Sequence, residues 1–233
     1  MNFELILIGT VHGDPQGYER LTNLLGRLRP EVVTVEISRF SVRYRRAWEG
    51  RWKARLQETL AGLPPGAGGH PAIRMIAAQI ALPFEYRAAR DYGRRNRARC
   101  LSLDLGAVSR RHLPRYGELL STVNLEALLE KDTEPPEALV AREFQRARLA
   151  LAHPPWRLAG QKSPETLRRE LFVARRLRRL ALKHGRIVHL GGWQHLVPWR
   201  DGDGMRAWLK DQQPLIILAD EGDLPALEEQ LSD

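Results

Sequence analysis

The sequence predicts an α/β protein with a mainly parallel central sheet, flanking helices and two pseudo-repeated halves separated by a helical insertion. Short apolar runs of strand length alternate with longer amphipathic segments, which is typical of strands that are buried between helices. A strand that leads into Gly-x-x-His occurs near each end of the chain. Each copy is followed, at nearly the same distance, by a proline, a second apolar run and an acidic residue.

The first copy occupies residues 4–12, which read Glu-Leu-Ile-Leu-Ile-Gly-Thr-Val-His. The apolar run ends at Gly9, and His12 follows at the carboxyl end of the expected strand. A glycine suits a strand end where there is no room for a Cβ atom. Pro30 stops the intervening helix, and the next strand carries Glu36 six positions after that proline.

The second copy occupies residues 186–195, which read Arg-Ile-Val-His-Leu-Gly-Gly-Trp-Gln-His. Here Gly192 precedes His195, and Asp220 lies six positions after Pro214. Ligands of open α/β sheets bind at the carboxyl ends of the strands. We therefore expect the two histidines and the two acids to contribute to one shared site.

Apolar spacing, prolines and glycines predict the remaining elements. We expect strands at residues 3–8, 31–37, 99–105, 186–190 and 215–218, and helices at residues 16–28, 39–61, 72–81, 83–96, 111–121, 125–131, 136–151, 164–183 and 224–231. These form one domain over residues 1–233, with repeat halves at 1–39 and 185–233. The mostly helical insertion at 40–184 includes the strand near 99–105 and could cap the strand ends.

Composition narrows the functional class. The formal charge is +9, but the basic residues are mostly arginines spread along helices, which argues against nucleic acid as the main partner. No apolar run approaches the roughly 20 residues of a membrane span, and the N-terminus has no basic signal region. The single cysteine, Cys100, excludes an internal disulfide. We expect a cytoplasmic protein without membrane contact, and homo-oligomerisation stays open.

The repeated histidines carry the chemical prediction. Two imidazoles with one or two carboxylates suit a divalent metal such as Zn, Mn, Fe or Co, with positions left for water. The expected donors are His12, His195 and Glu36. The same groups could instead act without a metal as general acid and base. The sequence leaves both chemistries open.

Further acids are weaker candidates. Asp104 ends the third expected strand as Glu36 ends the second, although it could equally N-cap the following turn. Glu85 begins a helix, where the helix dipole favours an anion in any case. Glu170 lies among arginines, so an exposed ion-paired face is the simpler interpretation. His189 lies inside an apolar strand, so we expect it to pack in the core.

Several motifs together resemble the TraB/PrgY/Tiki (GumN-like) superfamily, to which erythromycin-esterase-like and haem-binding ChaN proteins are distantly related. The similar segments are Gly9-Thr-Val-His12, Arg29-Pro-Glu-Val-Val-Thr-Val-Glu36, the Val35-Glu-Ile-Ser-Arg39 strand end, Glu85-Tyr-Arg-Ala-Ala89, Leu103-Asp104, Arg169-Glu-Leu-Phe-Val-Ala174 and Gly192-Trp-Gln-His-Leu196. The chain departs from the family pattern at Leu105, where an arginine would follow the acid.

The resemblance implies a sheet with helices on either side and a site built from His12, Glu36 and His195. For Tiki-like members it also implies metal-dependent peptide hydrolysis. Our leading hypothesis is a divalent-metal-dependent hydrolase acting on a peptide or small molecule, in which Asp104, Asp220 or Glu85 supports the ligands or acts as general base. The alternative is a non-catalytic protein that binds haem or a peptide pheromone in the same cleft. Gly9, Gly192 and Arg39 are further site candidates.

Overall fold

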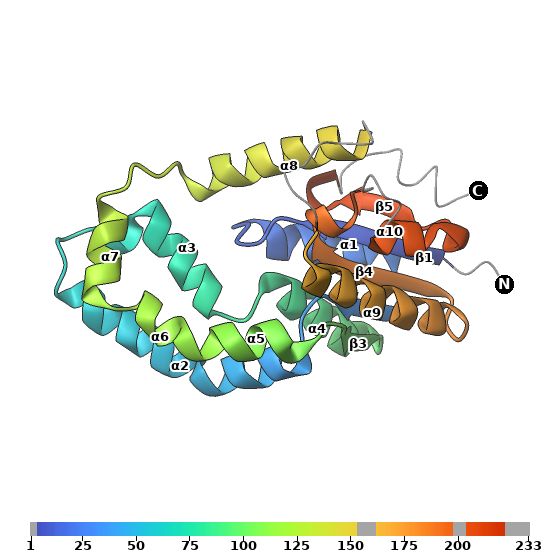
Figure 1. Ribbon diagram of the computed structural model, residues 1–233, viewed down its shortest axis with the longest axis horizontal. Coiled ribbons are helices and arrows are strands. Elements are labelled where there is room, and N and C mark those ends of the chain that lie inside the picture. The colour runs from blue at the N-terminus through green and yellow to red at the C-terminus, as the bar shows by residue number, and fades with distance from the viewer. Residues whose placement is uncertain (1–3, 153–161, 198–203, 222–233) are drawn as a thin grey trace.

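A computed structural model describes residues 4–152, 162–197 and 204–221. Its centre is a five-stranded, all-parallel sheet in the order β3-β2-β4-β1-β5 (Figure 1). The strands are β1 (Glu4–Thr10), β2 (Val32–Val35), β3 (Arg99–Ser102), β4 (Arg186–Gly192) and β5 (Leu215–Leu218). The predicted α/β fold class, with a parallel sheet and flanking helices, is confirmed.

The two motif-bearing strands are neighbours in the sheet. β1 and β4 pair in parallel, with Gly9 opposite Gly191 and Thr10 opposite Gly192. The glycines of the two motifs are thus offset by one residue in the sheet register. Both strands are almost wholly buried because helices cover both faces, which explains their continuous apolar runs.

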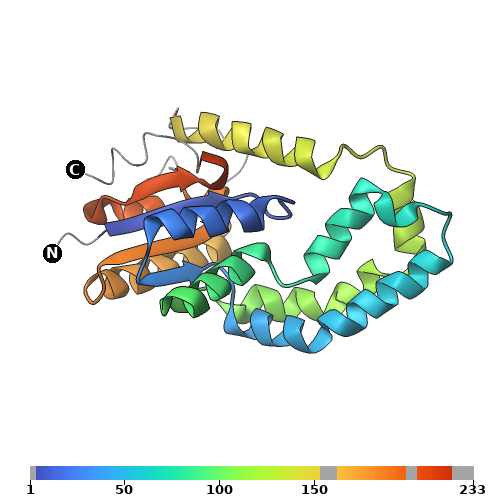
Figure 2. The same ribbon diagram turned by 180° about the vertical axis from the view of Figure 1, so that it is seen from behind.

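Helices pack on both faces of the sheet. On one face α1 (Gly17–Leu28) and α4 (Phe84–Asn96) contribute Leu21, Leu24 and Ala88 to the larger core (Figure 2). On the other face α9 (Pro164–Ala181) buries Val173 and Leu177 (Figure 1). This two-sided cover places the N-terminal turns of α1 and α4 on one face, and of α9 on the other, near the carboxyl ends of the strands.

The helical lobe, defined here as helices α2, α3, α5, α6 and α7, lies beyond the carboxyl ends of the strands (Figures 1 and 2). Its helices are α2 (Arg39–Ala61), α3 (Pro71–Ile80), α5 (Gly106–His112), α6 (Tyr116–Leu119) and α7 (Thr122–Leu129). They enclose a separate apolar cluster that includes Trp52, Ile73 and Leu120. α8 (Pro136–Ala152) runs back from this lobe and packs Phe144 and Ala147 into the sheet core.

Several predicted boundaries need correction. β3 ends at Ser102 rather than at residue 105, because the side chain of Asp104 accepts a hydrogen bond from the Leu105 backbone N–H at 2.7 Å. The helix predicted at 111–121 is instead the end of α5, a 3₁₀ turn at Leu113–Arg115 and α6.

α9 ends at Ala181, short of the predicted 183, so Gly185 does not cap it directly. Instead, the N–H of Gly185 donates to a carboxylate oxygen of Glu31 at 3.2 Å. The helix predicted at 224–231 lies outside the described residues. Within the part of the chain that the structure describes, no helix combines the length and apolarity that a bilayer crossing requires.

Candidate histidine–carboxylate site

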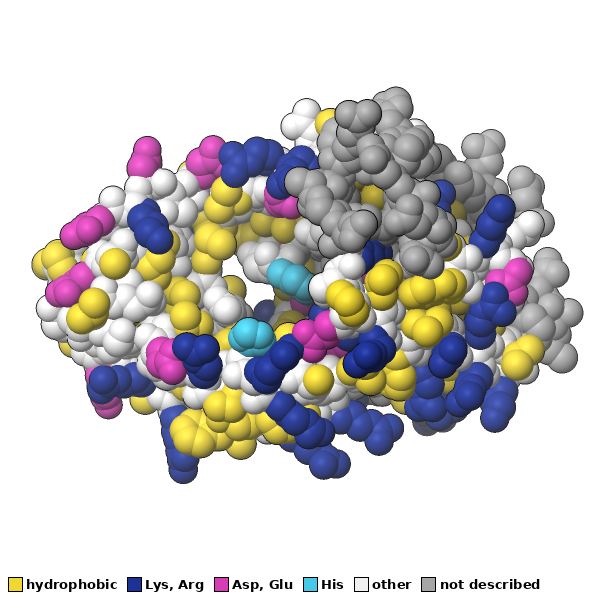
Figure 3. Space-filling view, viewed as in Figure 1, with side chains coloured by type: hydrophobic (Ala, Val, Ile, Leu, Met, Phe, Trp, Pro, Cys, Tyr) yellow, Lys and Arg dark blue, Asp and Glu magenta, His cyan; other side chains and the backbone are white. Residues whose placement is uncertain are grey.

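The histidines of the two motifs lie at the carboxyl ends of β1 and β4 and flank Gly192. A Cβ atom placed on Gly192 would lie 3.6 Å from Nε2 of His12 and 3.7 Å from Cδ2 of His195. Both rings therefore border the space in front of this glycine. Histidine side chains and carboxylates are visible around a hollow between the helical lobe and the sheet region (Figure 3). The same Cβ would lie 3.2 Å from Oε1 of Gln194, so the space between the two imidazoles is narrow.

His12 is held by a buried carboxylate from α4. Its Nδ1 lies 2.8 Å from Oε1 of Glu85, whose side chain is only 4% exposed. The hydroxyl of Thr10 donates to the same oxygen at 3.1 Å. The hydrogen bond to Glu85 raises the pKa of His12 above its ordinary value, although burial opposes this. With Nδ1 engaged, the opposite nitrogen, Nε2, is the one directed toward Gly192.

His195 belongs to η3 (Trp193–His195) and lies between two carboxylates. Its Nδ1 is 2.7 Å from Oε1 of Glu170, and its Nε2 is 2.9 Å from Oε1 of Glu36. Burial opposes protonation, but the two carboxylates outweigh it and raise the pKa of His195 to about 9. The imidazole is therefore protonated at neutral pH in the metal-free protein.

Glu170 is itself fully engaged inside the protein. Its carboxylate accepts from Nζ of Lys162 at 2.6 and 2.7 Å and from the backbone N–H of Met205 at 3.0 Å. Burial would raise the pKa of Glu170, but hydrogen bonds from His195 and Lys162 lower it. This carboxylate stays ionised and fixes the orientation of the His195 ring.

Glu36 is positioned from several sides. Its Oε2 accepts from the Gly192 backbone N–H at 3.2 Å, and its Oε1 accepts from Nη2 of Arg169 at 3.1 Å. Burial alone would raise the pKa of Glu36, yet His195 and Arg169 lower it to about 2. The guanidinium of Arg169 also makes two hydrogen bonds to Asp104, at 2.8 and 3.0 Å. Arg169 thus connects Glu36, which follows β2, with Asp104, which follows β3.

A further histidine lies behind this network. His189 is 1% exposed, and its Nδ1 lies 2.8 Å from the hydroxyl of Thr34, so the prediction that it packs inside is confirmed. Burial lowers the pKa of His189 to about 4, which keeps the ring neutral. A cavity of about 10 Å³, roughly enough for one water molecule, is lined by His189, Glu36 and His195.

The structure brings most of the predicted site residues together, but not all. Glu36, Glu85 and Asp104 lie with the two histidines in this network, and Gly9 packs closely against Leu218 beneath it. Asp220 instead pairs with Arg148 of α8. The prediction that Asp220 takes a place in the site equivalent to that of Glu36 is therefore wrong. Arg39 is exposed at the start of α2, and no contact with either histidine is seen among the described residues.

Sequence reasoning missed Glu170 as the partner of His195, because an acid in an arginine-rich segment looked exposed. Helical periodicity contained a signal for it. In α9 Glu170 shares the buried stripe with Val173, Ala174 and Leu177. In α4 Glu85 occupies the same kind of position relative to Ala88, Ala89 and Tyr92. An acid on the apolar stripe of a helix needs a buried partner, and here each partner is a motif histidine.

The fold and the site together define an α/β protein with two histidine–carboxylate pairs at the carboxyl ends of a parallel sheet. Neither a protein-family model, nor a curated protein, nor a solved structure matches the chain. Among residues 4–152, 162–197 and 204–221, no group of at least three His, Cys, Asp or Glu side chains is already arranged to hold a metal. The family resemblance therefore stays a prediction.

Proposed function

We propose that the protein is a hydrolase in which His12, His195 and Glu36 hold a divalent metal ion and act on a peptide or small-molecule substrate. One observation carries the proposal. Each motif histidine has its Nδ1 bonded to a buried helix carboxylate, Glu85 or Glu170, and both rings border the space at Gly192. A carboxylate on one imidazole nitrogen is the usual support of a histidine whose other nitrogen binds metal.

The donor set fits such an ion chemically. Two imidazole nitrogens and one glutamate are a common ligand set of catalytic zinc, and Mn or Co would also accept these donors. His195 must first give up the proton that Nε2 shares with Glu36. When bound, the ion would supply Lewis acidity, lowering the pKa of a water molecule and polarising a substrate carbonyl.

The protein's own residues do the positioning. Glu85 fixes the tautomer of His12 so that Nδ1 carries the proton, and Glu170 does the same for His195. Arg169 holds Glu36 in place and keeps it ionised. Asp104, bound through the same guanidinium, orients Arg169 and is a positioning residue in this proposal.

The test uses the full chain loaded with Zn²⁺, Mn²⁺ or Co²⁺ after chelator treatment. Metal content is measured by mass spectrometry, and hydrolysis is followed with labelled casein peptides and p-nitrophenyl acetate. His12→Ala and His195→Ala should each lose metal and turnover. The matched control is His112→Ala, because this histidine is exposed on α5. Unchanged metal content and turnover in both site variants would overturn the proposal.

Two other outcomes are also informative. Turnover that survives complete metal removal but not His195→Ala would replace the metal with acid–base chemistry by the His195–Glu36 pair. A Soret band on haem titration without any turnover would favour the non-catalytic binding protein.

A further inference from the structure

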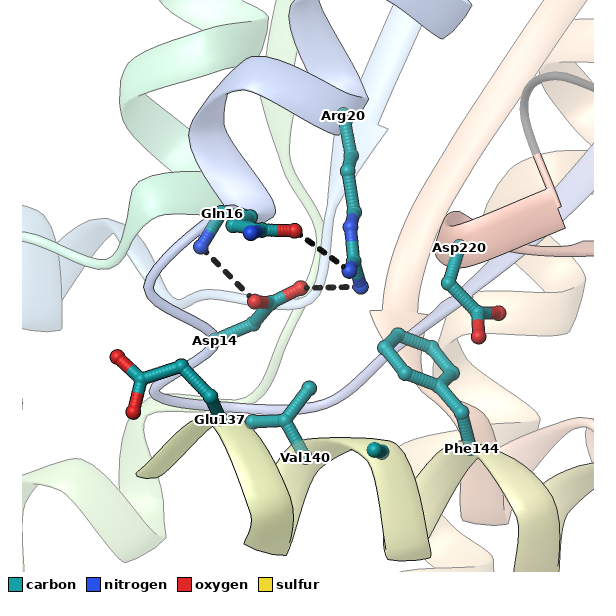
Figure 4. Close-up of a pocket in the computed structure, with 8 residues that line it drawn as sticks. Asp14, Gln16, Arg20, Glu137, Val140, Phe144 and Asp220 are labelled. Atoms are coloured by element: carbon teal, nitrogen blue, oxygen red, sulfur yellow. Dashed lines mark hydrogen bonds and ion pairs between the residues drawn. The ribbon is translucent and has the colours of Figure 1, made fainter. Parts of the chain in front are cut away.

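A second cavity lies beside the histidine site, between the start of α1, the helix α8 and the short turn η5 (Ala219–Glu221) (Figure 4). Its volume is about 260 Å³. This is slightly below the range typical for drug-sized ligands, so the cavity suits a single side chain or a small amine. It opens next to the loop that follows β1, because the lining residue Asp14 comes two positions after His12.

The cavity has one apolar and one polar wall. α8 supplies the apolar wall through Val140, Ala141 and Phe144. Opposite them lie Asp14 and Arg20, as Figure 4 shows. An elongated ligand with an aliphatic stem and a polar head would satisfy both walls at once.

The polar groups of the lining are mainly acidic. The lining contains three carboxylates, those of Asp14, Glu137 and Asp220, and a single cation, Arg20. That guanidinium is already engaged by Asp14 at 3.1 Å and by the side-chain oxygen of Gln16 at 2.8 Å. Among the residues that line the cavity, carboxylates thus outnumber cations three to one.

The arginines that offset the other two carboxylates do not line the cavity. Glu137 is paired with Arg74 at 2.9 Å, and Arg148 serves both Asp220 and Glu221. The Oδ1 atom of Asp220 is buried and has no hydrogen-bond partner among the residues that the structure describes. An unpaired buried carboxylate oxygen is costly, so a hydrogen-bond donor that reached this atom would be stabilising.

We propose that this cavity binds the ammonium or guanidinium end of an aliphatic chain, such as a lysine or arginine side chain. The charged head would donate to Asp14 and Asp220, and the methylene stem would pack on Val140 and Phe144. The Phe144 ring already lies under the Arg20 guanidinium at 5.5 Å, which shows that this wall accepts a cation.

Its role as a specificity pocket for basic substrate residues rests on the proposed hydrolase function, whereas cation binding itself does not. A substrate chain whose basic side chain entered the cavity would lie next to the loop that carries His12. The pocket would then select peptides with lysine or arginine near the bond that is cleaved.

The experiment compares three ligands of equal length, pentylammonium, pentan-1-ol and pentanoate, by calorimetry and by methyl NMR of Val140 and Ala141. We expect pentylammonium to bind at least about tenfold more tightly than the alcohol and to shift both methyl signals. Asp220→Asn should weaken its binding about tenfold, and Ala141→Trp should abolish it by filling the cavity.

The matched control is Asp211→Asn, which removes a surface ion pair between Asp211 and Arg178. This variant should bind pentylammonium with an affinity within about twofold of wild type. Equal binding of the three ligands, no binding of pentylammonium, or equal effects of the two Asp→Asn variants would overturn the inference. If circular dichroism shows that Asp220→Asn does not fold, the Ala141→Trp variant is the test. Pentylammonium binding that survives Ala141→Trp would then overturn the inference. No turnover is measured, so failure here and failure of the hydrolase proposal are separate results.

Discussion

Nε2 of His195 lies 2.9 Å from Oε1 of Glu36, so the two groups proposed to bind metal already bind each other through a proton. This contact explains why three metal ligands are not preassembled although their donor types are suitable. Metal binding must open the pair and release its proton. In the metal-free protein, the two donor atoms are therefore bonded to each other and are not available to an ion.

The first prediction concerns that proton. Zn²⁺ binding at pH 7.5 should release at least one proton, because the pKa of His195 is about 9 in the metal-free protein. The metal affinity should rise about tenfold per pH unit until that pKa is passed. Calorimetry in buffers of different ionisation enthalpy measures the release. An affinity that does not change between pH 7 and pH 9 would contradict it.

The second prediction concerns stability of the metal-free protein. The pKa of His195 is raised from 6.5 to about 9, so protonation stabilises the fold fully below pH 6.5. This contribution is lost as the pH rises through about 9, and the free energy of unfolding should fall by on the order of 3 kcal/mol.

Urea unfolding in the presence of chelator, at pH 6.5 and above 9, tests this. His195→Gln should remove most of the decline, while His112→Ala should show it unchanged. A wild-type protein with the same unfolding free energy at both pH values would show that these carboxylates do not raise the pKa of His195.

The third prediction concerns Glu170 as a positioning residue. Glu170→Gln should lower metal affinity and turnover by about 10- to 100-fold, since the amide supports His195 less well than a carboxylate. Glu165→Gln, on the same helix but half-exposed and paired with Arg111, is the control. Because an altered His195 must also titrate differently, the pH profile of turnover should shift in Glu170→Gln alone. An unshifted profile would reduce Glu170 to a structural role.

The fourth prediction concerns the glycines of the second motif. A Cβ at Gly191 would lie 2.9 Å from Oε2 of Glu36 and 3.3 Å from His189, so Gly191→Ala should displace Glu36 and abolish turnover. The control is Gly26→Ala in α1, where a Cβ meets nothing within 4 Å. That variant should be active and more stable by up to about 1 kcal/mol. Full activity of Gly191→Ala would show that Glu36 is dispensable.

The sequence was sufficient to predict the parallel sheet, because buried parallel strands are continuous apolar runs and β1, β4 and β5 all show this. The meeting of His12 and His195 was predicted from repetition and from the rule that ligands bind at strand carboxyl ends. The length of β3 was overestimated because Leu103 and Leu105 look like strand residues. The side chain of Asp104 ends the strand before them.

The partners of the histidines could not be predicted from the motifs. Glu85 and Glu170 come from helices on opposite faces of the sheet, 73 and 25 residues from the histidines that they bind. Nothing local distinguishes them from exposed acids except their position on the apolar stripe. Asp220 matched the repeat pattern, but spacing alone does not fix which way a side chain points after a strand.

The strand order has a consequence for biosynthesis. β4 lies between β2 and β1, although it is made long after both. A nascent chain that has emerged only as far as α9 cannot close its sheet, because the central slot is empty until residues 186–192 are translated. The same late strand brings Gly192 and His195. His12 and His195 therefore cannot come together at the sheet until residues 186–195 have been translated.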